Sequence, residues 1–428
     1  MQKYSFLLVL LAALAFVGLS NATLTIPSGI QYYVAVNITN SQTTATPSPF
    51  QQMINITEST FGNYIAYNKN FANFEYFYAN GTIIPAWIES NSSGKLITWV
   101  KLTPSIPANG KLTIYLGFAS KTTNLLSSSG TSGIGEAPQL SSTYGQYDDG
   151  ASVFTNYWNF AGTTLPSSLT AEGATGEITI NNGITFSGSS DVLVRSTSAI
   201  SYPQITDALI QTSTSAAYPG VVIGEATTTT MLGSQAWLEN GYSWDYYNGA
   251  WRLEYISPSA GRNIVSQVSA NMVAGDVYSI VWVAVGNEKT YINYVNQING
   301  ADTTVSSIGN YYAYLGFDTS GTTSFTAQWL RTRAYPPNGV MPSVSFGSVQ
   351  QTSGASLTIS PNPATYGQSI TITATCLVST DTCAIDYPSL GTHIAEGTGT
   401  ATYTYNAFAL GAGTYSYFYA NDLTAGTA

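Results

Sequence analysis

The chain is dominated by an alternation of apolar and polar residues with a period of two. The run Leu112–Phe118 reads LTIYLGF and places a large apolar residue at every second position, as does Ile370–Cys376, which reads ITITATC. Such alternation predicts half-buried strands. The spacing of an amphipathic helix is not sustained anywhere after residue 23. We therefore expect an all-β protein of tandem β-sandwiches, first jelly-roll-like and then an incomplete Ig-like sandwich.

The clearest local geometry is a hairpin at 242–255. The dipeptide Asn248-Gly249 separates YSWDYY from AWRLEY, and this favours a two-residue type I′ turn. That turn pairs Tyr247 with Ala250 and Asp245 with Arg252. It gathers an aromatic face of Tyr242, Trp244, Tyr246, Trp251, Leu253 and Tyr255, and an opposite face of Ser243, Asp245, Arg252 and Glu254. We expect the aromatic face in a core and the charged face in water; a sugar-binding aromatic platform is the alternative.

Two polar stretches predict the domain organisation. Residues 125–143 are rich in Ser, Gly and Thr, and residues 348–354 are short and polar. Stretches of this composition are typical of linkers. They predict sandwiches at 23–124, 144–347 and 355–428.

The N-terminus predicts export. Lys3 precedes an apolar run at 6–17, and small residues around Ala22 suit cleavage there, so 1–22 is interpreted as a signal peptide. An uncleaved anchor helix is the alternative. No later run reaches the length of a membrane span, so we expect none in the mature chain. Four sequons, at Asn37, Asn55, Asn80 and Asn91, suit a glycosylated extracellular or cell-surface domain.

The two cysteines, Cys376 and Cys383, are close in sequence. In an exported chain we expect them to form a disulfide across a short hairpin, the alternative being two free thiols.

Composition excludes several function classes. The chain has 12 Lys+Arg against 22 Asp+Glu, a net charge of −10, and only 8% charged residues where about 25% is usual. Nucleic-acid binding needs clustered cations and is not expected. Nucleotide binding has no support either, because no glycine-rich phosphate loop is present. With so few cations, self-repulsion stays modest when the carboxylates protonate, which predicts tolerance of acid.

Several segments carry a family resemblance. The stretches 74–88, 96–102 and 106–118 resemble the domain-of-unknown-function family 2341, although that family commonly ends its strand with Tyr-Tyr-Gly-Asn where this chain has Tyr115-Leu-Gly-Phe118. Residues 147–342 are similar to a concanavalin/laminin-G-like jelly roll, and the last segment resembles an Ig-like surface repeat. The resemblance implies a component of an archaeal cell surface, with no agreed biochemical role.

The Ig-like segment departs from the antibody pattern. Gly413–Tyr417 resembles a penultimate strand, with Tyr417 where an inter-sheet cysteine would lie, and little chain follows before Ala428. We expect the natural chain to continue, the alternative being a partner strand that completes the sheet.

Candidate metal and catalytic residues are few. Asp148 and Asp149 precede Gly150 and could offer oxygen ligands to Ca²⁺, the alternative being a solvated turn. A glycosidase needs paired carboxylates, and the Glu-x-Asp-x-x-Glu pattern of lectin-fold hydrolases is absent. Asp245 faces Arg252, so a cross-strand salt bridge explains that carboxylate.

Candidate ligand-binding residues form two groups. Tyr311 and Tyr312 lie in a tyrosine cluster, while Arg331 and Arg333 alternate along a strand and could clamp an acidic sugar. The alternative for the arginines is an ion-paired or solvated strand face. His393, the single histidine, is interpreted as a surface residue.

The sequence favours an exported, non-enzymatic structural or adhesive cell-surface protein of unknown ligand. Its partners would be glycans or other surface proteins. We expect no cofactor, and Ca²⁺ is the one candidate ion. A lectin-like carbohydrate-binding module, in a form that could depend on calcium, is the alternative. A secreted glycan hydrolase is the third interpretation.

Overall fold

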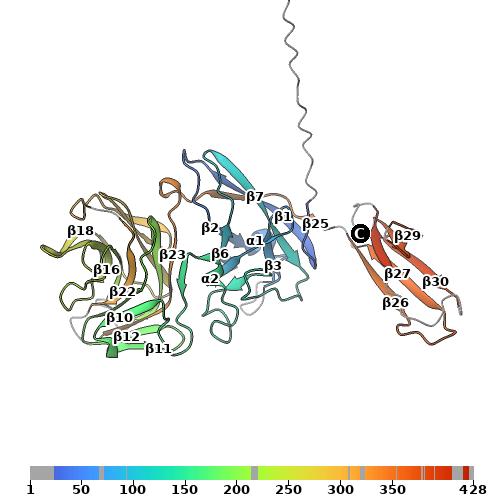
Figure 1. Cartoon of the computed structure of the whole chain (residues 1–428). Coiled ribbons are helices and arrows are strands. Elements are labelled where there is room, and N and C mark those ends of the chain that lie inside the picture. Colours follow the sequence, from blue (N-terminus) through green and yellow to red (C-terminus); the bar gives the residue numbers. More distant parts are fainter. Residues whose placement is uncertain are drawn as a thin grey trace, which may run out of the picture.

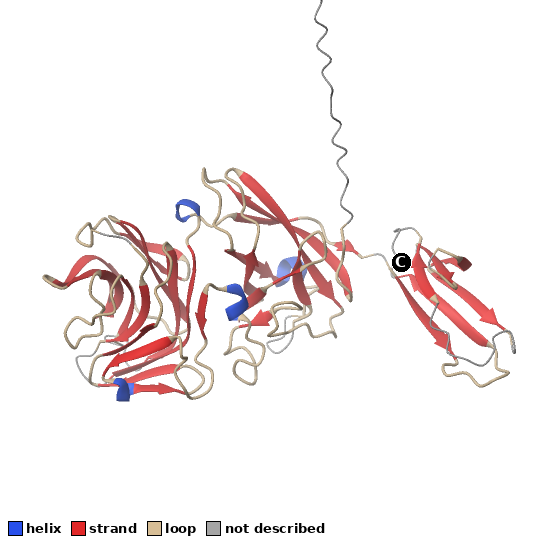
Figure 2. Cartoon of the chain, viewed as in Figure 1, coloured by secondary structure: helices blue, strands red, loops and turns tan. Residues whose placement is uncertain are grey.

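The computed structural model describes residues 24–66, 72–92, 94–213, 220–306, 309–318, 323–352, 354–376, 379, 381–389, 391–406 and 418–423. Their strands form three β-sandwiches (Figures 1 and 2), which confirms the all-β prediction. The expected signal peptide and the stretch Gly413–Tyr417 lie outside the described residues.

The first sandwich packs two sheets around one core. One sheet has the order β24-β1-β7-β3-β4, with β25 also pairing β1, and the other has the order β2-β6-β5-β8. The period-two pattern turns Val34, Val36 and Ile38 inward, where each is fully buried. The elements are β1 (Ile30–Asn40), β2 (Phe50–Thr57), α1 (Glu58–Phe61), β3 (Phe74–Phe77), β4 (Ile83–Ile84), β5 (Ala86–Ser92), β6 (Lys95–Leu102), β7 (Gly110–Ala119), β8 (Gly135–Glu136), β24 (Ser343–Phe346) and β25 (Gln350–Gln351).

The second sandwich is inserted into the first. Strands β24 and β25 follow it in the chain, yet they pair with β1: Val36 opposes Phe346 and Tyr32 opposes Gln351. The expected boundary at 347 and the expected linker at 348–354 are therefore corrected, because this segment completes the first sheet. The expected linker at 125–143 is also ordered, with Ile134 buried and β8 pairing β5 in parallel.

The second sandwich packs a seven-stranded sheet, β10-β13-β22-β15-β16-β17-β18, against an eight-stranded one, β11-β12-β23-β14-β19-β20-β21, with β9 also pairing β23. Aromatic and branched side chains fill the space between them. The elements are α2 (Gly150–Val153), which leads into it, β9 (Asn156–Trp158), β10 (Leu169–Gly173), η1 (Thr175–Glu177), β11 (Ile178–Ile180), β12 (Ile184–Gly188), β13 (Val192–Ser196), β14 (Gln204–Ser213), β15 (Val221–Ala226), β16 (Gly241–Tyr247), β17 (Ala250–Ser257), β18 (Gly261–Ser269), β19 (Asp276–Ala284), β20 (Asn287–Ile292), β21 (Val295–Asn299), β22 (Tyr312–Phe317), β23 (Thr323–Ala334) and η2 (Pro337–Gly339), which follows it.

The predicted hairpin is β16–β17, and its register is confirmed: Tyr247 pairs with Ala250, Asp245 with Arg252 and Tyr242 with Tyr255. Its aromatic face lies in the core, with Trp244 and Trp251 stacked at 5.2 Å between ring centroids. The core interpretation of this face is therefore confirmed.

The opposite face of that hairpin is buried rather than wet, which corrects our expectation. Residues 227–240 fold back over the sheet, and the Cβ that Gly316 lacks would lie 2.6 Å from the carbonyl oxygen of Ala236. Asp245 and Glu254 are each only 1% exposed beneath this cover. The sequence pattern could not reveal this, because the covering segment has no strand periodicity.

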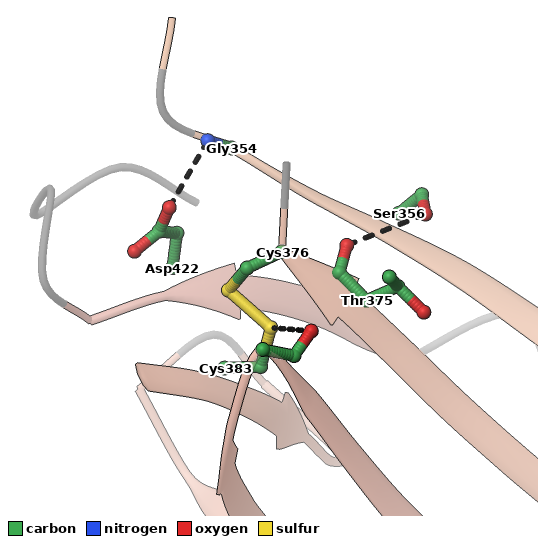
Figure 3. Close-up of a disulfide and its surroundings, with 7 residues drawn as sticks. Gly354, Ser356, Thr375, Cys376, Cys383 and Asp422 are labelled. Atoms are coloured by element: carbon green, nitrogen blue, oxygen red, sulfur yellow. Dashed lines mark hydrogen bonds between the residues drawn. A yellow bond between two sulfur atoms is a disulfide. The ribbon is translucent and has the colours of Figure 1, made fainter. Parts of the chain in front are cut away.

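The third sandwich pairs β26-β27-β30 with β29-β28-β31. The predicted disulfide joins Cys376, at the end of β27, to Cys383 in β28 (Figure 3). It therefore links the two sheets beside a small core. The expected short hairpin between the two cysteines is corrected, because β27 and β28 lie in different sheets. The elements are β26 (Ala355–Ser360), β27 (Ile370–Cys376), β28 (Thr382–Asp386), β29 (His393–Thr398), β30 (Thr400–Tyr405) and β31 (Tyr419–Asp422).

Candidate functional site

Arg331 of β23 is the centre of the junction between the first two sandwiches. Its side chain is fully buried, although arginine is seldom so. Four aromatic rings surround the guanidinium, a geometry that favours a desolvated cation. The distances from Cζ to the ring centroids are 4.2 Å for Phe154, 4.4 Å for Trp329, 4.8 Å for Trp99 and 5.4 Å for Trp87.

Two carboxylates neutralise this arginine, one from each sandwich. Arg331 Nη2 donates to Glu89 Oε2 of β5 at 2.8 Å, and Nε donates to Asp207 Oδ2 of β14 at 2.9 Å. Arg333 Nε also donates to Asp207 Oδ2, at 2.8 Å. Burial alone would raise the pKa of Asp207, but Arg333 and Arg331 outweigh burial and hold that pKa below its usual value. The junction is thus a charge-balanced cluster in an apolar surrounding.

Asp148 links this junction to the second sandwich. Trp87 Nε1 and the Gly150 amide donate to Oδ1 at 2.8 and 3.0 Å, and Asn159 Nδ2 donates to Oδ2 at 2.6 Å. The Tyr157 hydroxyl lies 3.0 Å from both oxygens. Burial raises the pKa of Asp148, and these donors oppose the rise. A carboxylate has about four acceptor positions, so these donors fill them.

A cleft opens beside Asp148, with a volume of about 190 Å³. The loop before α2, strand β9 and the loop before β10 contribute its walls. Ser168 is exposed at the rim, and its Oγ accepts a hydrogen bond of 2.8 Å from Trp158 Nε1. None of the described residues that line it is positively charged. They are Asp148, Ala151, Tyr157, Trp158, Asn159, Pro166 and Ser168.

The two aspartates that we considered for Ca²⁺ have separate environments. N–H and O–H donors surround Asp148, whereas Asp149 accepts from Ser152 and Gly130, and burial raises its pKa to about 6. Among the described residues, no group of three or more His, Cys, Asp or Glu side chains could hold a metal ion.

The four expected ligand-binding residues do not form one surface. Tyr311 is 2% exposed, and its hydroxyl donates to the Gln204 carbonyl oxygen at 3.3 Å within the core. The next residue, Tyr312, points to the opposite face of the sheet from Tyr311. There its ring centroid lies 5.7 Å from Cζ of Arg195. Arg331 and Arg333 share a face, as their alternation predicted, but it is the buried junction. The ion-paired alternative describes them, because no solvent reaches Arg331 to bring a ligand.

Another cluster of charged residues, Asp245, Glu254 and Arg262, lies beneath residues 227–240. Burial raises the pKa of Glu254 to about 7 and raises that of Asp245 further above its usual value. Arg262 Nε lies 3.3 Å from Glu254 Oε2, and its Cζ lies 4.1 Å from the ring of Trp237. The expected salt bridge between Asp245 and Arg252 gives way to a network in which Arg262 pairs with Glu254. Glu254 is buried in this pair, whereas the Arg262 side chain is 29% exposed.

Of the sequons, Asn55 and Asn80 are exposed, whereas Asn37 and Asn91 are half-buried. His393, interpreted as a surface residue, is 31% exposed at its side chain, and its Nδ1 contacts Asp386 Oδ1.

Sequence reasoning missed most of this site. Glu89 and Arg331 are 242 positions apart, and Trp87 and Asp148 are 61 apart, so no local motif joins them. Only the paired arginines and the adjacent aspartates carried a signal, because charged residues are few in this chain and the members of each pair stand close together in the sequence.

No helix among the described residues is long and apolar enough to cross a membrane. No protein-family model matches the chain. It is similar to the uncharacterized protein 562 of Sulfolobus islandicus rod-shaped virus 1, with 31% identity over 344 residues, covering 72% of this chain and 58% of that protein. The chain thus spans less than two thirds of that relative.

Several solved structures resemble part of the chain weakly. The carbohydrate-binding module CBM66 from Bacillus subtilis gives a TM-score of 0.28 at 10% identity, over 42% of this chain and 97% of that one. A legume lectin-like domain from Entamoeba histolytica gives 0.29 at 13%, over 39% and 90%. A β-glucanase from Bacillus licheniformis gives 0.32 at 11%, over 42% and 97%. Likeness at this level transfers no activity.

Proposed function

We propose that this chain is an exported, non-enzymatic surface protein whose second sandwich adheres to glycans. The observation that carries the proposal is that the second sandwich is inserted into the first and joined to it at both of its ends. The chain enters it from the first sandwich and returns to pair β24 with β1, so the second sandwich is a head with two connections to its support. Thr352, where the chain leaves, donates from its amide to the carbonyl oxygen of Gln31 at 2.8 Å.

The junction supports this proposal because it fixes the head. Arg331 joins carboxylates of both sandwiches, and the Gln51 side chain of β2 donates to the Val153 carbonyl at 3.2 Å. A large, desolvated interface restricts relative motion of domains. A fixed head holds its outer surface in one orientation, which suits adhesion.

A glycan array tests the proposal with the full chain, applied with and without EDTA. We expect binding to a subset of glycans in both conditions, because Asp148 is already occupied by donors. Chromatography of the bound glycans should reveal no shortened products. Absence of binding in both conditions would overturn the adhesive function, and released sugar would overturn its non-enzymatic part.

A further inference from the structure

We infer that the cleft beside Asp148 binds a single neutral sugar residue. This inference rests on the proposed function and names the ligand class and the site. The cleft has a volume of about 190 Å³, below the range of about 300–1,000 Å³ usual for the pockets of drug-sized ligands. A cleft of this size suits one sugar ring rather than an oligosaccharide.

The chemistry of the walls matches a hydroxylated ring. The Ser168 hydroxyl accepts from Trp158, which leaves its own proton free to donate to a ligand. The Tyr157 hydroxyl directs its proton to Asp148, which leaves its oxygen free to accept. Tyr157 and Ser168 both line the cleft, so its lining offers one hydrogen-bond acceptor and one donor. Pro166 and Ala151 supply apolar surface for the C–H face of a ring, whereas Trp158, only 5% exposed, holds Ser168 from the core side.

The site is held rigidly from behind. Asp148 fixes Tyr157 and Asn159, and Trp87 of the first sandwich fixes Asp148. The Asn159 carbonyl oxygen accepts a further hydrogen bond of 2.7 Å from Tyr144. Such a second layer keeps the polar groups in place before a ligand arrives, which lowers the cost of ordering them. Asp148 acts as a positioning residue, because its oxygens are already occupied.

The electrostatics exclude acidic ligands. Asp148 lines the cleft, and none of the described lining residues carries a positive charge that could pair with a carboxylate or phosphate. A uronic acid or sugar phosphate would bring a second negative charge toward a buried carboxyl group. We therefore expect neutral hexoses to bind and their uronic acid counterparts to be rejected.

Saturation-transfer NMR and calorimetry on the full chain test this inference, with the methyl glycosides of glucose, galactose and mannose and with methyl glucuronide as probes. We expect at least one neutral glycoside to bind, and both Ser168→Ala and Tyr157→Phe to weaken it about tenfold, which corresponds to the loss of one hydrogen bond. Ser167→Ala, at an exposed neighbouring position outside the cleft, should leave binding unchanged.

The outcomes separate this inference from the proposed function. Array binding that persists unchanged in both cleft variants would overturn the cleft and leave the adhesive function standing. Preference for the glucuronide would also overturn it. Failure of every probe and every array glycan would overturn both. Circular dichroism of each variant confirms that it is folded. Tyr157→Phe keeps the ring but also removes a donor to Asp148, so Ser168→Ala is the decisive variant.

Discussion

Arg331 and Glu89 form a buried ion pair between two sandwiches, with 2.8 Å separating Nη2 from Oε2. The arginine side chain is 0% exposed and the glutamate 5%. Without this contact Glu89 would be buried without its cation. Arg331 and Arg333 would share the single carboxylate of Asp207, so each sandwich would bury an unbalanced charge at a large desolvation penalty. The two sandwiches therefore stabilise each other through this contact.

Replacing Arg331 should destabilise both sandwiches together. Arg331→Met leaves Glu89 buried without its cation, and we expect a loss of about 3–5 kcal/mol in the free energy of unfolding. Urea denaturation followed by tryptophan fluorescence measures it, since Trp87, Trp99 and Trp329 surround the site. The matched control is Arg195→Met, which breaks a half-buried pair with Glu172 and should cost about 1 kcal/mol or less. Equal losses in the two variants would contradict the assigned role.

The turn of the β16–β17 hairpin should depend on Gly249. Its φ of +80° lies in the left-handed region, and no atom lies within 4 Å of where a Cβ would be. Gly249→Ala therefore tests backbone strain without a clash, and we expect a loss of about 1–2 kcal/mol. Thermal unfolding measures it. Gly176→Ala, in equally open space but without a positive φ, should be neutral or slightly stabilising. A neutral Gly249→Ala would argue against the type I′ turn.

Stability should fall as the pH rises through neutrality. Burial raises the pKa of Glu225 from 4.5 to about 8, so between these values the folded chain holds a proton that the unfolded chain has lost. The folded state then binds more protons, and the free energy of unfolding decreases with pH across that window, by a few kcal/mol in total. Chemical denaturation at pH 5, 6, 7 and 8 measures this slope.

A charge-free variant checks the cause. Glu225→Gln cannot titrate, so its stability should vary less between pH 5 and pH 8 than that of the parent chain. Glu58→Gln, at an exposed position, should keep the parental slope. At lower pH, Asp207 acts in the opposite direction: its depressed pKa gives stability that is lost as the pH falls through that pKa. A parental slope in Glu225→Gln would refute the assignment.

The disulfide should stabilise only the third sandwich. Cys376 and Cys383 are seven positions apart, and closing so short a loop restricts the unfolded chain by about 2–3 kcal/mol. The replacement of both cysteines by serine should lower one calorimetric transition, that of the small third core, and leave the transition of the first two sandwiches in place. A shift of both transitions would show that the third sandwich unfolds with the others.

Local pattern was enough to predict the β16–β17 hairpin. Asn248 and Gly249 both adopt positive φ, as the turn requires, and the alternation beside them fixed each cross-strand pair. The same pattern gave the wrong environment for Asp245. It shows which residues share a face, whereas the cover over that face comes from residues 227–240, whose position depends on the whole sheet.

The sequence by itself determined the all-β class, the hairpin register and the disulfide, because period-two alternation, turn residues and short cysteine spacing act between near neighbours. Only the tertiary structure decided that β24 returns to β1, that Arg331 meets Glu89, and that Tyr157 and Ser168 border one cleft. These contacts join residues far apart in the chain. Their energies come from desolvation and packing in three dimensions, and no spacing in the sequence records them.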